Sequence, residues 1–139
     1  MTDQNAKMVL IVDDEETLRQ MYRARLEASG YVVVEAVNGE EGMARAVESH
    51  PDCILLDIMM PRVNGFDVLD ILKTTPETKD ISVIVLTNLM QDEAKRRVMK
   101  SGAAVCLVKA LVTPLQVVET INQIVARSDQ QTLAPPATS

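Results

Sequence analysis

Short apolar runs alternate along the chain with longer segments in which apolar residues recur every three or four positions. Runs of strand length that are apolar throughout are typical of strands buried on both faces of a parallel sheet. The segments between them have the spacing of helices that pack on such a sheet. This alternation predicts an α/β fold. The expected strands are residues 8–12, 31–36, 52–56, 81–86 and 103–108.

Capping residues mark the ends of several expected helices. Asn38 is followed three residues later by Glu41, a pattern typical of a helix N-terminus. Thr113 and Gln116 repeat this pattern before the last apolar helical face. We expect that last helix to end near Arg127.

The 139 residues are enough for one domain with its own core and too few for two. Residues 1–7 are polar, and residues 128–139 are polar and contain prolines without any periodicity. Such segments bury too little apolar surface to become ordered. We therefore expect a disordered N-terminus over residues 1–7, one domain over residues 8–127, and a disordered tail or linker stub over residues 128–139.

The charge and the apolar pattern argue against two classes of partner. A net charge of -6 argues against direct binding to nucleic acid, because such binding relies on clustered Lys and Arg. The first residues contain neither a signal sequence nor a membrane span, which predicts a cytoplasmic protein without membrane insertion. Cys53 and Cys106 both lie in apolar runs, so we expect buried, reduced thiols.

Polar residues follow four of the expected strands. Asp13 and Asp14 follow the first strand, and Asp57 follows the third. Thr87 and Lys109 follow the fourth and the fifth. The carboxyl ends of parallel strands lie at one edge of a sheet, where α/β proteins bind their ligands. These five side chains are therefore expected to share one pocket.

The residue types in this set predict a particular chemistry. Crowded carboxylates repel one another unless a cation neutralises them, and a cluster of oxygen ligands suits a hard divalent ion such as Mg²⁺. A carboxylate can also attack phosphorus when a metal and further groups take up the developing charge. Lys109 and Thr87 could supply such groups. The set therefore predicts Mg²⁺-assisted phosphoryl transfer to a carboxylate.

These residues and their neighbours resemble the motifs of receiver domains, the phosphorylation-controlled domains of two-component response regulators in bacterial-type signalling. The resemblance covers about residues 8–127, and it is closest to the single-domain chemotaxis type. It implies a doubly wound, flavodoxin-like sheet with strand order 2-1-3-4-5 and five flanking helices. The motifs are Val12-Asp13-Asp14, the run from Leu56 to Pro61, Gly65-Phe66, Leu86-Thr87 and Val108-Lys109.

The resemblance also implies a role for each matching residue. Asp57 would be the phosphoacceptor, with Thr87 and Lys109 contacting the phosphoryl group. The donor would be a histidine kinase or a histidine phosphotransfer protein, and a downstream protein would read the signal through direct contacts. Such a domain catalyses only its own phosphorylation and dephosphorylation, so we expect no enzyme in the usual sense. The implied Mg²⁺ ligands are Asp13, Asp14, Asp57 and the backbone carbonyl of Met59.

Two residues depart from the pattern of the family. Cys106 occupies the position where many receivers have an aromatic switch residue, so the coupling between Thr87 and the outer surface must either take another route or be weaker than usual. Ala110 replaces the proline that usually follows the lysine. A cis bond before a residue other than proline costs about 3 kcal/mol. We therefore expect a trans peptide between Lys109 and Ala110.

Two other functions stay open on the sequence alone. The first is an adaptor with the same fold that acts without phosphorylation, and it would acquire no acid-labile label on Asp57. The second is a flavin or nucleotide enzyme built on the same kind of sheet. Such an enzyme needs a loop that cradles phosphate after the first strand, where the acidic residues 13–16 would repel it.

Overall fold

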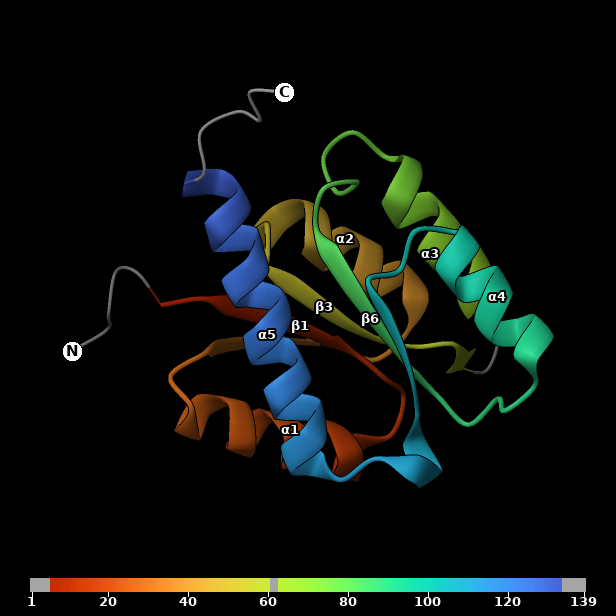
Figure 1. Cartoon of the computed structure of the whole chain (residues 1–139), viewed down its shortest axis with the longest axis horizontal. Coiled ribbons are helices and arrows are strands. Elements are labelled where there is room, and N and C mark those ends of the chain that lie inside the picture. The colour runs from red at the N-terminus through yellow and green to blue at the C-terminus, as the bar shows by residue number, and fades with distance from the viewer. Residues whose placement is uncertain (1–5, 61–62, 134–139) are drawn as a thin grey trace.

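Five parallel strands form one sheet through the middle of the molecule (Figure 1). The computed structural model describes residues 6–60 and 63–133. The strands lie side by side in the order β2-β1-β3-β6-β7, which is 2-1-3-4-5 when they are counted along the chain. The expected class and strand order are therefore confirmed. The strands are β1 (Met8–Val12), β2 (Val32–Ala36), β3 (Cys53–Asp57), β6 (Ser82–Thr87) and β7 (Val105–Val108).

Five α-helices cover the two faces of this sheet (Figure 1). One face carries α1 (Glu16–Ala28) and α5 (Pro114–Leu133). The other carries α2 (Gly39–Ser49), α3 (Gly65–Thr74) and α4 (Asp92–Lys100). With both faces covered, the carboxyl edge of the sheet is left as the place where strand ends meet loops and solvent.

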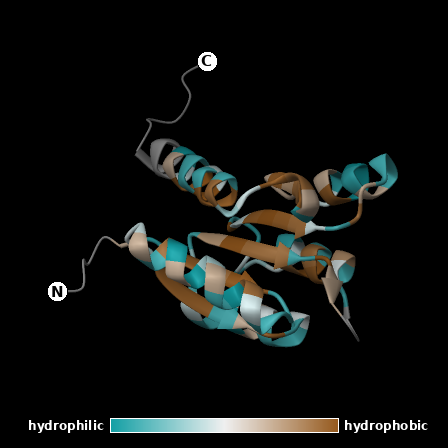
Figure 2. Ribbon diagram, turned by 90° about the horizontal axis from the view of Figure 1, so that it is seen from below, coloured by the Kyte–Doolittle hydropathy of each residue, from teal (hydrophilic) through white to brown (hydrophobic). Residues whose placement is uncertain are grey.

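The sheet separates two hydrophobic clusters. Successive residues of a strand point to opposite faces, so Leu10 and Val12 belong to the cluster under α2, α3 and α4. Val9 and Ile11 belong to the cluster under α1 and α5. In Figure 2 the strands are brown, and the helices around them are banded in brown and teal. Burial on both faces explains why the strand segments are apolar at almost every position.

The predicted helix caps are present in the structure. The side chain of Asn38 accepts a hydrogen bond of 2.8 Å from the backbone N–H of Glu41 at the start of α2. Thr113 and Gln116 form a reciprocal capping box before α5, with bonds of 2.8 and 3.1 Å. Each bond satisfies a backbone or side-chain group that the first helical turn would otherwise leave unpaired.

The end of the last helix differs from the expectation. α5 continues past Arg127 to Leu133, so residues 128–133 are helical and not part of a disordered tail. This stretch contains no glycine or proline before Pro135, and residues such as Gln favour helix, so nothing local stops the hydrogen-bond ladder. At the other end, residues 6 and 7 are described, and the carbonyl of Lys7 accepts a hydrogen bond of 2.9 Å from the N–H of Val32, so Lys7 does not belong to a disordered N-terminus. Residues 1–5 and 134–139 lie outside the described residues.

Three short elements were not predicted. β4 (Met59–Met60) and β5 (Val63–Asn64) pair antiparallel after β3, where the sequence indicated only a break. A 3₁₀ turn, η1 (Lys109–Leu111), follows β7. The peptide between Lys109 and Ala110 is trans as expected, and no peptide bond among residues 6–60 and 63–133 is cis.

The two cysteines differ in burial. Both are free thiols, and Cys53 is buried as expected. Cys106 is only partly buried, because β7 is an edge strand of the sheet. In the described part of the chain, no helix combines the length and the apolar character that crossing a membrane requires.

Candidate functional site

Three carboxylates meet at the carboxyl edge of the sheet. Oxygen atoms of Asp13, Asp14 and Asp57 lie within 4.8 Å of one another. Asp13 and Asp57 are buried, with 4% and 3% of their surface exposed, whereas Asp14 is exposed. The pairing of β1 with β3 places Val12 opposite Leu56, so the residues that follow them emerge side by side. The register of two strands therefore builds the cluster from distant parts of the chain.

Lys109 reaches the same cluster from the end of β7. Its Nζ donates hydrogen bonds to Asp57 Oδ2 at 3.1 Å and to Asp13 Oδ2 at 3.3 Å. The Oε1 atom of Glu15 lies 3.6 Å from the same nitrogen. One largely buried ammonium group therefore faces three carboxylates, and the negative charge exceeds the positive charge.

Backbone N–H groups hold the second oxygen of each buried carboxylate. The N–H of Met59 donates to Asp57 Oδ1 at 3.0 Å, and the N–H of Glu15 donates to Asp13 Oδ1 at 2.9 Å. Each side chain thus has one oxygen on the backbone and the other on Lys109. This arrangement fixes the orientation of both carboxylates.

Thr87 ends β6 beside this cluster. Leu86, the residue before it, pairs with Asp57 across β3 and β6, so Thr87 lies at the same edge of the sheet. Thr87 is 2% exposed, and its Oγ1 accepts a hydrogen bond of 3.1 Å from the N–H of Leu89. A hydroxyl that accepts one bond still has a proton to donate. The expected meeting of Asp13, Asp14, Asp57, Thr87 and Lys109 at one edge is therefore present.

The surroundings shift the proton affinities of the buried groups. Burial raises the pKa of Asp57 to about 6, and Lys109 and the Met59 N–H offset this only in part. Burial also raises the pKa of Asp13. Burial alone would lower the pKa of Lys109, but the charges of Asp57 and Asp13 outweigh it and raise that pKa. The site therefore favours additional positive charge.

A model of the response regulator receiver domain matches residues 9–122. The chain belongs to this family. Receiver domains are signalling domains of two-component systems, and the acidic cluster, the lysine and the threonine of this receiver lie where the motif resemblance predicts them. The family that was expected from the motifs is confirmed.

Relatives of this receiver include both short and long proteins. It is 36% identical over 116 residues to the polar-differentiation response regulator DivK of Brucella ovis, covering 84% of this chain and 94% of DivK. It is 42% identical over 95 residues to RpaA of Synechocystis, named a DNA-binding dual master transcriptional regulator. That match covers 68% of this chain but only 39% of RpaA. The receiver thus spans well under two thirds of some relatives.

A solved structure shows the same fold. The chemotaxis protein CheY4 of Vibrio cholerae superposes with a TM-score of 0.79 at 30% identity. The alignment covers 86% of this receiver and 98% of that protein. This coverage and TM-score support the flavodoxin-like arrangement described above.

The hairpin after Asp57 shapes one wall of the site of this receiver. Met59 lies in β4, and its side chain is 55% exposed. Gly65 donates from its N–H to the carbonyl of Ile58 at 3.2 Å. A Cβ atom on residue 65 would lie 2.3 Å from that carbonyl oxygen, so only glycine fits there. The close approach of the two backbones keeps Met59 next to Asp57.

One residue at the site was not predicted. Arg19 is buried on α1, and its Nη1 donates to the backbone carbonyl of Asp13 at 2.7 Å. A signal was present in the sequence, because Arg19 shares a helical face with Tyr22 and Leu26, at spacings of three and seven residues. A basic residue on an inward face needs a buried partner.

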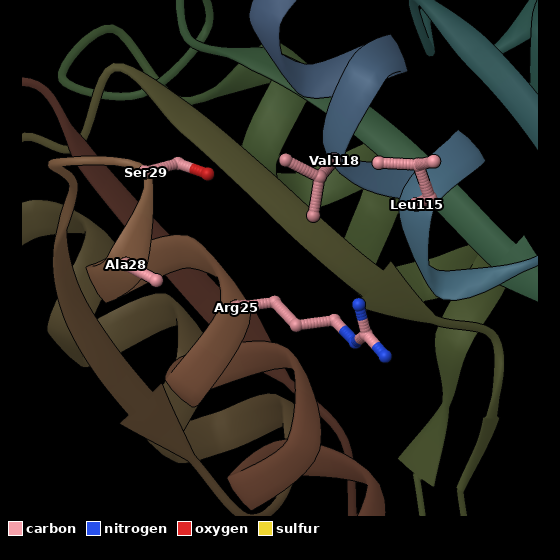
Figure 3. Close-up of a pocket in the computed structure, with 5 residues that line it drawn as sticks. All are labelled: Arg25, Ala28, Ser29, Leu115 and Val118. Atoms are coloured by element: carbon pink, nitrogen blue, oxygen red, sulfur yellow. The ribbon is translucent and has the colours of Figure 1, made fainter.

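A pocket between α1 and α5 is separate from the acidic cluster (Figure 3). Its volume is about 220 Å³. The lining side chains carry no carboxylate, so this pocket lacks the groups that would hold a cation. They are Arg25, Ala28, Ser29, Leu115 and Val118.

Proposed function

We propose that Asp57 accepts the phosphoryl group of this receiver, from a histidine kinase or a histidine phosphotransfer protein. The observation that carries the proposal is the hydrogen bond of 3.1 Å between Asp57 Oδ2 and Lys109 Nζ within the acidic cluster. A buried carboxylate next to an ammonium group and two further carboxylates is an unusual and costly arrangement. A role of Asp57 in phosphoryl transfer would explain this arrangement.

The proposed transfer proceeds in one displacement. A carboxylate oxygen of Asp57 attacks the phosphorus of a phosphohistidine, forming a P–O bond as the P–N bond breaks. The imidazole leaves with the electron pair and takes up a proton. Lys109 and the hydroxyl of Thr87 face the phosphoryl oxygens and stabilise their charge. Water later attacks the phosphorus of the acyl phosphate and restores the Asp57 carboxylate.

The residues of the cluster fit a magnesium ion. Carboxylate oxygens are the ligands that hard divalent cations prefer, and three of them lie within 4.8 Å of one another. Asp13, Asp14 and Asp57 would hold Mg²⁺ together with the backbone carbonyl of Met59. When bound, the ion would neutralise charge at the attacking and phosphoryl oxygens. It would also favour the ionised form of Asp57, whose pKa burial raises.

Labelling with radioactive acetyl phosphate tests the proposal. We expect the wild-type protein to acquire an acid-labile phosphoryl label in the presence of Mg²⁺ and to lose that capacity in EDTA. Asp57→Asn should acquire no label, because an amide oxygen is a poor nucleophile. Asp70→Asn, which changes an exposed carboxylate on α3, should be labelled like the wild type.

Two results would contradict the proposal. Label retained in full by Asp57→Asn would place the acceptor elsewhere. A wild-type protein that takes up no label would instead favour an adaptor that works without phosphorylation. The altered residues Cys106 and Ala110 would then be read as part of a binding surface.

A further inference from the structure

Arg19 is a charged side chain in the interior, with 9% of its surface exposed. It faces the sheet from the first turn of α1, on the same side as Tyr22 and Leu26. Burying a guanidinium group is costly unless its hydrogen bonds and its charge are matched. The contacts of this group therefore indicate what it does.

Two contacts tie Arg19 to the neighbouring strands. Nη1 donates to the backbone carbonyl of Asp13 at 2.7 Å, and Nε donates to Glu35 Oε1 on β2 at 3.1 Å. The other oxygen of Glu35 accepts from Arg23 Nη1 at 2.6 Å. Glu35 thus fixes the orientation of the Arg19 guanidinium group. The guanidinium group in turn binds the backbone of the loop that follows β1.

The carbonyl that Arg19 binds belongs to the peptide between Asp13 and Asp14. The preceding peptide is held as well, because the N–H of Asp13 donates to the carbonyl of Ala36 at 3.1 Å. Because a peptide group is planar, fixing its carbonyl also fixes the direction in which the next residue leaves it. Arg19 therefore holds the peptide that joins the two residues carrying these carboxylates.

We propose that Arg19 is a positioning residue for the cation site, and that it acts by holding the Asp13-Asp14 peptide. The inference rests on the proposed function, since it assumes that these carboxylates bind Mg²⁺. The planar guanidinium makes two directional bonds at once, which an ammonium group on a flexible chain does not reproduce. Arg19 is expected to act through Asp13 and Asp14 without touching the ion.

The test compares Arg19→Met with Arg23→Met as a matched control. Both remove a cation paired with Glu35, but Arg23 is more exposed, and its ion pairs join it to Glu35 and Glu27. Mg²⁺ affinity is measured by NMR titration of the amide signals near Asp13. We expect Arg19→Met to weaken Mg²⁺ binding by about tenfold, as when a partner of a metal ligand is removed. Arg23→Met should bind Mg²⁺ within about twofold of the wild type.

Two further variants keep the test independent of folding. Arg19→Lys retains the charge but not the geometry, so it should restore little of the affinity. Glu35→Gln keeps the size of the side chain but binds the Arg19 guanidinium group less tightly, so we expect it to lower the Mg²⁺ affinity by about threefold. This variant tests the inference even if Arg19→Met does not fold. Labelling by acetyl phosphate should recover in each folded variant when Mg²⁺ is raised to saturation.

The outcomes separate the two proposals. Folded Arg19 and Glu35 variants that are less stable to urea but bind Mg²⁺ like the wild type would show a purely structural role and overturn the inference. A wild-type protein that does not bind Mg²⁺ would overturn the proposed metal site as well. Loss of Mg²⁺ affinity in Arg23→Met equal to that in Arg19→Met would show a general charge effect and also overturn the inference.

Discussion

At the scale of single residues, Asp57 is a carboxylate whose surroundings favour its neutral form in the absence of metal. Burial raises its pKa to about 6 from the ordinary value of 3.8. Between these two values the folded protein binds a proton more tightly than the unfolded chain does. Asp57 therefore contributes stability at low pH, and this contribution is lost as the pH rises through about 6.

The metal-free protein should consequently become less stable between pH 4 and pH 7.5, and Asp57→Asn should reduce this loss. A shift of this size corresponds to roughly 1–3 kcal/mol. We expect the variant to exceed the wild type in free energy of unfolding at pH 7.5 by about this amount. Urea unfolding in EDTA at the two pH values measures the difference.

Asp70→Asn serves as the control for this measurement, because Asp70 is exposed on α3. Its pH dependence should match that of the wild type. Part of the slope should survive in Asp57→Asn, since burial also raises the pKa of Asp13. The raised pKa of Lys109 preserves its contribution through neutral pH. Equal slopes for Asp57→Asn and wild type would contradict the assignment.

At the scale of elements, the connection from β3 to α3 links the position of Asp57 to the packing of the start of α3. Gly65 begins α3 and approaches the backbone of Ile58 so closely that an added Cβ would lie 2.3 Å from its oxygen and 2.4 Å from its Cα. Backbone atoms cannot move aside as a flexible side chain can. A substitution there must displace the hairpin that carries Met59.

Gly65→Ala should therefore destabilise the protein by about 3 kcal/mol, at the upper end of overpacking effects. It should also weaken Mg²⁺ binding, because the displaced segment includes the Met59 N–H that orients Asp57. Urea unfolding and an NMR titration with Mg²⁺ measure the two effects.

Gly30→Ala provides the contrast. Gly30 has a φ of +95° but no atom within 4 Å of an added Cβ, so only backbone strain of about 1–2 kcal/mol should appear. It lies at the far end of α1 from the acidic cluster, so Mg²⁺ affinity should be unchanged. Equal losses of Mg²⁺ affinity in the two variants would count against the role of the close contact at Gly65.

At the scale of the whole molecule, the sheet divides the interior into two cores. Leu69 on α3 packs in one cluster, and Ile121 on α5 packs in the other; both have no exposed surface. Among residues 6–60 and 63–133, none belongs to both clusters. A substitution in one cluster should therefore affect the packing of the other cluster only through the sheet.

Leu69→Ala and Ile121→Ala should each lower the free energy of unfolding by about 2–5 kcal/mol through loss of burial and creation of a cavity. The double variant should lose the sum to within about 0.5 kcal/mol, because distant sites without shared partners act independently. Ile71→Ala, 46% exposed on α3, should cost much less and serves as the control. A coupling well above this limit would show that the two cores are not independent.

Much of the architecture followed from local patterns. Apolar runs predicted the five strands because burial on both faces leaves little room for polar residues. The caps at Asn38 and Thr113 were predicted because a helix start needs a side-chain acceptor at a defined spacing. α5 was predicted too short, since its polar end carries no periodic signal, although local propensity still favours helix there.

The sequence by itself determined the class of the fold, the family, and the residues that follow the strands, because these depend on short-range periodicity and on the order of motifs. Only the tertiary structure decided the distances among Asp13, Asp57 and Lys109 and the raised pKa of Asp57. It also brought Arg19 to the carbonyl of Asp13. Those features depend on strand register and on the burial of groups far apart in the chain, which a linear pattern does not specify.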